Sequence, residues 1–365
     1  MIKRKLKLFY KSIVKLFFET LYGNITLPKT TRGIIKKIKI EKTFFKTFKN
    51  KHYQIYIVKN SRIYTDNNEN VAIIKNNTIL PHISFQQVYG QLRNHSYNSV
   101  LKNGTPAFVK KIKGKIFNLC QGASGNNYFH FLFDIIPKIY LLSSKIDLNQ
   151  IDFFYVSEPK KWQIKILKIL GINQKKLLNS KIYKHISADE IYAVDHPWYT
   201  NGHIQNSLKE IPSWIIFKNR EMFLKENKTK YKKKIFLDRS KSPYNHCQIN
   251  NQNIINQFLK KKKIKSYKPE FLNFKNQINL FNQSSIIFGA HGASFTNIIF
   301  CKPRTKIIEL IPSDHPNKKC QRISQILNLK YFRIKTKPDN KDPNYPFKIN
   351  LEKKHLNLIN KIINL

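Results

Sequence analysis

Short apolar runs bounded by turn residues recur through the first half of the chain, and their spacing predicts alternating strands and helices. Three runs rich in β-branched and aromatic residues are typical of strands: HYQIYIVK, NVAIIKNNTIL and GKIFNLCQ. Helical spacing follows at 126–142, and a strand-like IDFFYVSE then precedes a helical WQIKILKILG. Alternation of this kind predicts an α/β layer.

The second half alternates more regularly. Its pattern predicts strands at 234–240, 264–269, 284–289, 306–312 and 330–336, and helices at 249–263, 277–283, 291–300 and 321–328. Repeated strand–helix units with right-handed crossovers build an open parallel sheet. We therefore expect a Rossmann-like domain in this half.

A polar, lysine-rich segment at 218–233 is interpreted as the link between two domains. The 365 residues are enough for two domains, each with its own core. We expect four segments: an amphipathic basic helix at 1–25, an α/β domain at 26–225, a Rossmann-like domain at 226–340, and a C-terminal tail or helix at 341–365 that packs back on the N-terminal domain.

The N-terminal segment combines an apolar stripe with a basic surround. The stripe is Ile2, Leu6, Phe9, Ile13, Phe17 and Leu21, and the cations around it are Lys3, Arg4, Lys5, Lys7, Lys11 and Lys15. Two interpretations remain open: a helix that lies on an anionic membrane surface, or a helix packed on its own domain with solvated lysines. No stretch approaches the ~20 apolar residues of a membrane span, and we expect no secretory signal.

The amino-acid composition bears on which binding partners are expected. A formal net charge of +46 favours nucleic acid or an anionic membrane at first sight. The charge comes almost entirely from lysine, with nine arginines, in a chain equally rich in Asn and Ile, so it reflects a bias of the whole sequence. We expect no nucleic-acid partner. The four cysteines form no CxxC pair, which favours unpaired thiols and a cytoplasmic location.

The segment AHGASFTN (290–297) lies where an apolar strand leads into a helix, a position at which open α/β sheets bind anions. Gly289 and Gly292 permit close approach to the backbone, and Ala293 keeps the wall thin. His291 can donate to a phosphate oxygen, and Ser294 and Thr296 add hydroxyls. The alternative is a tight turn with a structural histidine.

Two further residues are expected beside this turn. Arg239 follows a strand in LDRS, and a guanidinium binds phosphate in a fork. Glu309, in KIIELIP, either accepts bonds from ribose hydroxyls or caps a neighbouring helix. The sequence has no Asp-x-Asp pair and no His/Asp/Glu cluster at metal-ligand spacing, so we expect no metal ion and no other cofactor.

A second constellation lies in the first half. Asn126, His130 and Asp134 are four residues apart, which places them on one side of a helix. An amide, an imidazole and a carboxylate in line suit contact with a polyhydroxylated ligand and supply a general base, either His130 or Asp134 with a pKa raised by burial. The alternative is that these groups only hydrogen-bond the preceding loop.

These motifs together resemble glycosyltransferase family 61, the capsular polysaccharide biosynthesis type. Three blocks carry the resemblance, in the same order as in the family: NYFHFLFDIIP (127–137), LDRSKSPYNHCQINN (237–251) and SSIIFGAHGASFTNIIFCKPRTKIIEL (284–310). Two positions depart from the family pattern, since a second arginine is replaced at Asn245 or His246 and an Asn-Glu pair by Asn250-Asn251.

The resemblance implies a GT-B-like fold, with two Rossmann-like domains facing a cleft. It implies an inverting, metal-independent transferase that moves a sugar from a nucleoside-diphosphate sugar, expected to be UDP-linked, to a glycan or lipid-linked acceptor. The donor would contact Arg239, His291, Gly292, Ala293, Ser294, Thr296, Asn297 and Glu309, and the acceptor Asn126 and Asn127, with His130 and Asp134 as catalytic residues. The alternative function is a non-catalytic basic protein that binds nucleic acid or another polyanion.

Overall fold

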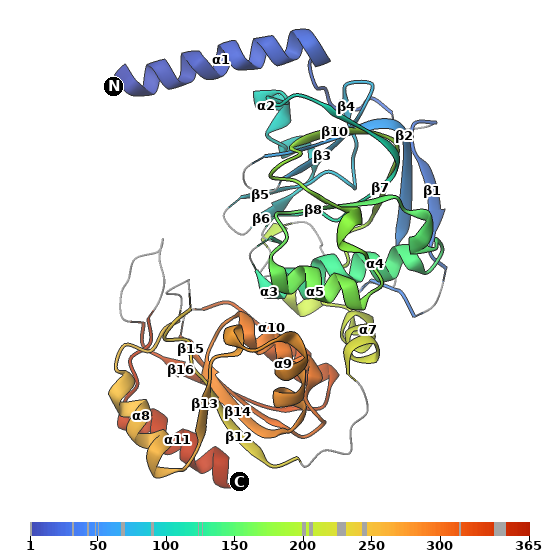
Figure 1. The fold of residues 1–365 in the computed structure, drawn as a ribbon. Coiled ribbons are helices and arrows are strands. Elements are labelled where there is room, and N and C mark those ends of the chain that lie inside the picture. The colour runs from blue at the N-terminus through green and yellow to red at the C-terminus, as the bar shows by residue number, and fades with distance from the viewer. Residues whose placement is uncertain are drawn as a thin grey trace. The chain divides into compact units, whose positions relative to one another are not determined.

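The computed structural model divides the chain into two compact units, Met1–Ile215 (unit 1) and Ile216–Leu365 (unit 2), each built around its own sheet (Figure 1). The structure describes residues 2–30, 33–41, 44–47, 49, 51–66, 70–88, 91–122, 124–125, 127–198, 202–203, 207–224, 231–242, 247–313, 315–338 and 348–365. Both units combine helices with sheets, so the predicted α/β class is confirmed. None of the described helices is long and apolar enough to cross a bilayer.

Unit 1 contains an eight-stranded mixed sheet in the order β4-β3-β2-β10-β7-β8-β9, with β1 paired to β2, and a small sheet in the order β11-β6-β5. The strands are β1 (Lys36–Lys39), β2 (Gln54–Thr65), β3 (Val71–Lys75), β4 (Thr78–Ile79), β5 (Gln86–Val88), β6 (Gln91–Arg93), β7 (Lys110–Asn118), β8 (Phe153–Val156), β9 (Leu177–Asn179), β10 (His185–Val194) and β11 (Gly202–His203). The helices are α1 (Ile2–Tyr22), η1 (His95–Tyr97), α2 (Val100–Asn103), α3 (Tyr128–His130), η2 (Phe131–Ile135), α4 (Ile136–Ser143), η3 (Leu148–Gln150), α5 (Lys161–Ile169), η4 (Gln174–Lys176) and η5 (Leu208–Glu210).

The sheet of unit 1 is only partly Rossmann-like, which corrects the sequence-based expectation. The strands β7, β8, β9 and β10 run parallel, but β10 pairs antiparallel with β2, and β2, β3 and β4 form antiparallel hairpins. The turn between β3 and β4 contains only Asn76 and Asn77, both with positive φ. Such a short turn with two left-handed residues joins antiparallel strands, whereas a parallel pair needs a long crossover.

Unit 2 matches the predicted Rossmann-like domain closely. Its five strands are all parallel, in the order β13-β12-β14-β15-β16. They are β12 (Lys233–Leu237), β13 (Lys265–Tyr267), β14 (Ser284–Ala290), β15 (Lys306–Pro312) and β16 (Lys330–Thr336), and the helices are α8 (Gln252–Lys261), η6 (Pro269–Phe271), α9 (Phe274–Asn282), η7 (Ala293–Phe300), α10 (Lys319–Ile326) and α11 (Lys353–Asn364). The strand order reverses between β12 and β14, which is where doubly wound sheets bind ligands.

The boundary between the units lies earlier than the polar composition indicates. The helix α7 (Ser213–Phe223) occupies the start of the segment that we interpret as a linker. Its Arg220 donates from Nη1 to the carbonyl oxygen of Cys301 at 2.8 Å and to that of Ile299 at 2.5 Å, both in unit 2. These bonds hold the end of α7 to unit 2, which therefore begins at Ile216 rather than at residue 226.

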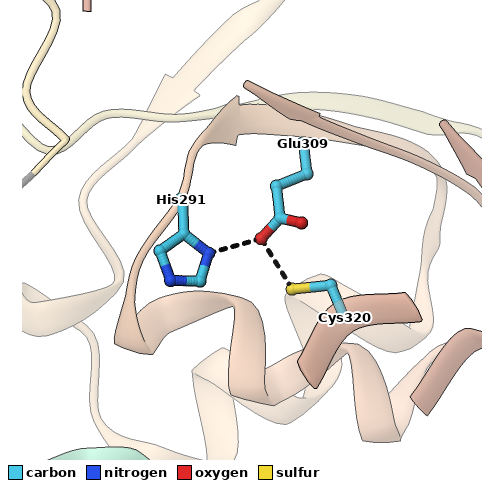
Figure 2. A group of neighbouring side chains, drawn as sticks. All are labelled: His291, Glu309 and Cys320. Carbon is cyan, nitrogen blue, oxygen red and sulfur yellow. Dashed lines mark hydrogen bonds and ion pairs between the residues drawn. The ribbon is translucent and has the colours of Figure 1, made fainter. Parts of the chain in front are cut away.

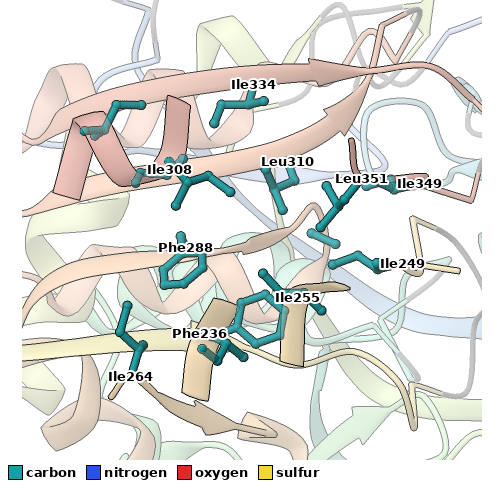
Figure 3. Packing of buried hydrophobic residues seen from close by; sticks show 14 of the residues in the cluster. Phe236, Ile249, Ile255, Ile264, Phe288, Ile308, Leu310, Ile334, Ile349 and Leu351 are labelled. Atoms are coloured by element: carbon teal, nitrogen blue, oxygen red, sulfur yellow. The ribbon is translucent and has the colours of Figure 1, made fainter. Parts of the chain in front are cut away.

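The C-terminal helix packs on unit 2, not on the N-terminal domain as expected from the sequence. Ile359, Ile362 and Ile363 of α11 join the core formed by Phe236, Phe288 and their neighbours (Figure 3). Asn251 holds the preceding segment by a pair of bonds to the backbone of Leu351, at 2.7 and 2.9 Å. The apolar face of α11 thus covers one face of the parallel sheet of unit 2.

Candidate active site

The sheet of unit 2 brings Arg239 against the turn at Gly292. The strand β12 ends at Leu237 and its neighbour β14 ends at Ala290, so both residues follow strands that flank the reversal of strand order. A Cβ built on Gly292 would lie 1.7 Å from Nη1 of Arg239. A side chain at position 292 would therefore displace the guanidinium from its place on this turn.

The turn leads into η7, which is a 3-10 helix over its whole length. Thr296 is fully buried, and Oγ1 of Thr296 and Oγ of Ser294 have no hydrogen-bond partner among the described residues. Buried hydroxyls ordinarily have hydrogen-bond partners. We therefore expect these two hydroxyls to bond to a ligand near the start of η7, which begins at Ala293. Asn297 serves the fold instead, because its amide donates to Oε1 of Gln277 at 2.8 Å.

His291 forms a buried pair with Glu309 of the adjacent strand. Nδ1 of His291 lies 2.5 Å from Oε1 of Glu309, while Tyr331 donates to Oε2 at 2.5 Å. Burial alone would raise the pKa of Glu309, but His291 and the hydrogen bonds of Cys320 and Tyr331 outweigh it and lower the pKa to about 2. The carboxylate is thus ionised and occupied, which corrects the expectation that it binds ribose or caps a helix.

The ionised Glu309 fixes the proton of His291 on Nδ1. Burial lowers the pKa of His291, and the charges of Lys319 and Arg239 lower it further against the opposing effect of Glu309. The ring is therefore neutral near pH 7, with its proton on the nitrogen that faces the carboxylate. A neutral ring in this tautomer has no proton on Nε2, so His291 donates from Nε2 to a phosphate only after taking up a second proton.

A lysine that sequence reasoning missed completes the positive surroundings. Lys319 is 3% exposed, and its Nζ donates to the carbonyl oxygen of Gly292 at 3.1 Å. Arg333 holds the loop before α10 by donating to the carbonyl oxygens of His315 and Asn317, at 2.5 and 3.2 Å. Burial lowers the pKa of Lys319 and of Arg239, because water is excluded from both cations. A bound anion would relieve that cost.

His291, Glu309 and Cys320 also lie close enough together to resemble a metal site, with ligand atoms within 4.8 Å of one another (Figure 2). Burial raises the pKa of the Cys320 thiol well above its ordinary value, so the sulfur keeps its proton and donates to Oε1 of Glu309 at 2.9 Å. Metal ligation needs a thiolate, and the charges of Lys319 and Arg239 oppose a cation here. The cluster fits a hydrogen-bond network beside an anion site better than a metal centre.

Unit 1 contains the second predicted constellation. Asn127 caps the helical segment by accepting from the backbone N–H groups of Phe129 and His130 at 2.9 and 3.3 Å, so its side-chain oxygen is already used. Asn126, the other expected acceptor-side residue, lies outside the described residues. The segment widens to a π-helix at η2, where the N–H of Ile136 bonds to the carbonyl oxygen of Phe131, directly before Pro137. Proline cannot donate to the preceding turn, and π segments of this kind are frequent at functional sites.

His130 and Asp134 form a buried pair on this segment, as their spacing predicts. Nδ1 of His130 lies 2.7 Å from Oδ2 of Asp134, which is fully buried. The imidazole side chain remains 11% exposed, and its Nε2 has no hydrogen-bond partner in the described part of the chain. The carboxylate therefore orients the ring so that Nε2 is left for a substrate.

Asp134 itself is held by neutral donors. Trp198 donates to Oδ1 at 2.6 Å, and Gln121 donates to Oδ2 at 2.9 Å. Burial alone raises the pKa of Asp134, but the charges of His130 and His196 and the hydrogen bonds of His130 and Trp198 outweigh it and lower the pKa. Asp134 thus orients His130 and does not have the raised pKa that a carboxylate base would need.

Comparisons with known proteins agree with these motifs. Residues 128–308 match the profile of the family Glycosyltransferase 61. A segment of 63 residues is 33% identical to beta-1,2-xylosyltransferase RCN11 of Oryza sativa subsp. japonica, and it covers 17% of this chain and 12% of that protein.

Among solved structures, similarity is found to the bacterial iron-containing dodecameric glycosyltransferase TibC from enterotoxigenic E. coli H10407. The identity is 10%, the TM-score is 0.30, and the match covers 78% of this chain and 81% of TibC. A structure of TibC in complex with ADP-D-beta-D-heptose matches with 10% identity and a TM-score of 0.31 over 87% of this chain and 86% of TibC. TM-scores this low do not establish a shared fold. The family match, which spans the His130–Asp134 segment, Arg239 and the turn at Gly292, identifies this chain as a member of glycosyltransferase family 61.

Proposed function

We propose that the protein transfers a sugar from a nucleoside-diphosphate sugar, with UDP as the nucleotide, to a hydroxyl of a glycan or lipid-linked acceptor. The observation that carries the proposal is the Arg239 guanidinium packed on the Gly292 turn at the strand-order reversal of unit 2. We assign the reaction to the assembly of a surface polysaccharide, such as a capsule, or of a glycoconjugate on the cytoplasmic side of the membrane.

The donor diphosphate would bind at the Gly292 turn. Arg239 supplies a partly buried cation and Lys319 a buried one, and Thr296 and Ser294 supply hydroxyls without partners among the described residues. Together they would neutralise the charge that develops on the leaving diphosphate, without a metal ion. Removing one such donor typically costs about 3–4 kcal/mol of transition-state stabilisation.

His130 would act as the catalytic base. As the acceptor oxygen attacks the anomeric carbon, its proton passes to Nε2 of His130, and the bond from the anomeric carbon to the diphosphate oxygen breaks. UDP leaves with the electron pair, and the configuration at the anomeric carbon inverts. Asp134 stabilises the imidazolium that forms, because its carboxylate lies 2.7 Å from Nδ1. A GT-B-like fold belongs to this proposal.

A thermal-shift screen of UDP, ADP, GDP and CDP tests the proposal most directly. We expect UDP to raise the unfolding temperature of the native protein, and to do so far less in Arg239→Ala. The matched control is Arg304→Ala, which removes an exposed arginine of the same unit. If another diphosphate stabilises instead, UDP is the wrong nucleotide.

The alternative function, a basic protein that binds polyanions through its lysines, predicts a different outcome. No nucleoside diphosphate would stabilise the fold, whereas heparin and duplex DNA would bind with a steep dependence on salt. That combination would reject glycosyl transfer in favour of polyanion binding.

A further inference from the structure

The apolar stripe of α1 faces solvent over most of its length. Leu6 and Phe9 are 61% and 66% exposed, and Ile13, Phe17 and Leu21 are half exposed. Leu16, three residues after Ile13, is 68% exposed beside the stripe. Soluble domains rarely leave a continuous stripe of large apolar side chains uncovered. Most of the stripe is therefore left uncovered by the rest of unit 1.

The contacts of α1 with unit 1 come from its other face and its C-terminal turns. The hydroxyl of Tyr22 accepts from the N–H of Val109 at 3.1 Å, and the Tyr22 carbonyl accepts from Nη2 of Arg62 at 3.2 Å. Phe18 packs edge-on against Phe108, with ring centroids 5.2 Å apart. The helix therefore touches the rest of unit 1 through its C-terminal turns. These contacts come mainly from residues outside the stripe, although the ring of Phe17 in the stripe also lies 6.2 Å from that of Phe108.

Charge separates the two faces of α1 further. Arg4, Lys7, Lys11 and Lys15 recur at steps of three and four residues, away from the stripe. The only acidic residue of the helix is Glu19, which forms an ion pair with Lys15 at 3.4 Å. A helix with an uncovered apolar face and a cationic opposite face suits the boundary between anionic lipid headgroups and acyl chains.

We propose that α1 docks in the plane of an anionic lipid bilayer, with its apolar stripe inserted and its cations at headgroup level. Phe108, 69% exposed and in edge contact with Phe17 at 6.2 Å, extends the inserted surface beyond the helix. Docking in this manner would bring the chain to lipid-linked acceptors. The argument for docking rests on the surface of α1 and Phe108, however, and not on the proposed transfer activity.

Sedimentation of the full chain with lipid vesicles tests the proposal. The vesicles are phosphatidylcholine alone, or phosphatidylcholine with about one third phosphatidylglycerol. We expect binding to the anionic vesicles only, and a loss of about tenfold or more in Phe9→Ala/Ile13→Ala, since two large inserted side chains are removed. The matched control is Leu8→Ala/Ser12→Ala, which alters exposed positions outside the stripe at the same spacing and should change binding less than about twofold.

Three results would overturn membrane docking. Equal vesicle binding by Phe9→Ala/Ile13→Ala would show that the stripe does not insert. Self-association in the absence of lipid that the same variant abolishes would identify a second copy of the chain as the occupant. Binding to duplex DNA that depends on Phe9 and Ile13 would identify nucleic acid. Stabilisation by UDP, measured on each variant, monitors unit 2 separately, so failure of membrane docking and failure of the transferase proposal are distinguished.

Discussion

Both units of the molecule contain a buried histidine–carboxylate pair, His130–Asp134 and His291–Glu309, and the two pairs differ in what surrounds them. In unit 1, His130 and Asp134 lie one helical turn apart, and neutral donors from Gln121 and Trp198 hold the carboxylate. In unit 2, His291 directly follows β14 and Glu309 lies in the neighbouring parallel strand β15, close to the cations Lys319 and Arg239.

The difference shows how the same pair of groups serves two kinds of chemistry. A carboxylate favours proton acceptance when it orients an imidazole whose other nitrogen has no partner, and His130 has this arrangement within the described part of the chain. A carboxylate beside buried cations leaves a local excess of positive charge, which favours an anion, as at His291. The role that we propose for each unit thus depends on the groups around the histidine–carboxylate pair, not on the pair itself.

The largest effect is expected from breaking the unit 1 pair. His130→Ala should lower the rate of UDP release from a UDP-sugar in the presence of acceptor by about 10²- to 10⁴-fold, because the proton acceptor is lost. Asp134→Asn should also lower the rate strongly, since the ring is no longer held by a carboxylate. UDP affinity, measured by calorimetry, should be unchanged in both variants.

The control for this experiment is His95→Ala, which removes a histidine of the same unit outside the pair. Transfer at the native rate in both His130→Ala and Asp134→Asn would refute the assignment of the base to unit 1.

The second effect concerns the anion site of unit 2. Arg239→Ala and Gly292→Ala should each weaken UDP binding by about 10- to 100-fold, the loss expected for a charged hydrogen bond of roughly 1.5–3 kcal/mol. Gly292 has an extended backbone that any residue adopts, so the cause in Gly292→Ala is the methyl group 1.7 Å from Nη1 of Arg239. The double variant should bind UDP about as weakly as either single variant, because both changes remove the same contact, that of the Arg239 guanidinium. Additive losses would contradict this coupling.

A smaller effect is expected from proton uptake by His291 when UDP binds, which would set this histidine apart from His130. The pKa of His291 is lowered in the ligand-free protein, and a bound diphosphate should raise it. Between those two pKa values the complex holds one more proton, so UDP affinity should fall as pH rises, by at most about tenfold per pH unit. Calorimetry in buffers of different ionisation enthalpy measures the uptake, and His291→Gln corrects for titration of the nucleotide. Uptake that persists in His291→Gln would place the proton elsewhere.

The smallest effect concerns one hydroxyl. Thr296 is fully buried, and its hydroxyl has no partner among the described residues, so Thr296→Val should stabilise the ligand-free protein by about 1 kcal/mol. The same change should weaken UDP binding severalfold if the hydroxyl contacts the diphosphate. Thr305→Val is the matched control, because Thr305 is equally buried but donates to the carbonyl oxygen of Lys302 at 2.7 Å. It should lower the unfolding temperature, and a lowered temperature in Thr296→Val would count against an available hydroxyl.

Features that depend on neighbours within a few residues could be predicted from the sequence. The period of apolar residues located the strands and helices of unit 2, and a spacing of four residues placed His130 beside Asp134. The glycine and small residues after β14 indicated a turn that something approaches closely, and in the structure Arg239 approaches Gly292. A helical period or a turn leaves its mark on adjacent positions, so one sequence is enough to read it.

Contacts between residues distant in sequence could not be predicted in this way. Glu309 faces His291 because β14 and β15 pair in one register, with Gly289 opposite Glu309. Lys319 is one of 58 lysines, the 67 basic residues less nine arginines, and no local pattern separates it from the others. Two other features also depend on distant parts of the chain: the unit on which α11 packs, and the solvent exposure of the α1 stripe. Both result from strand register and from many weak packing contacts between distant segments. A short window of sequence contains neither of these, because both depend on where the rest of the chain lies.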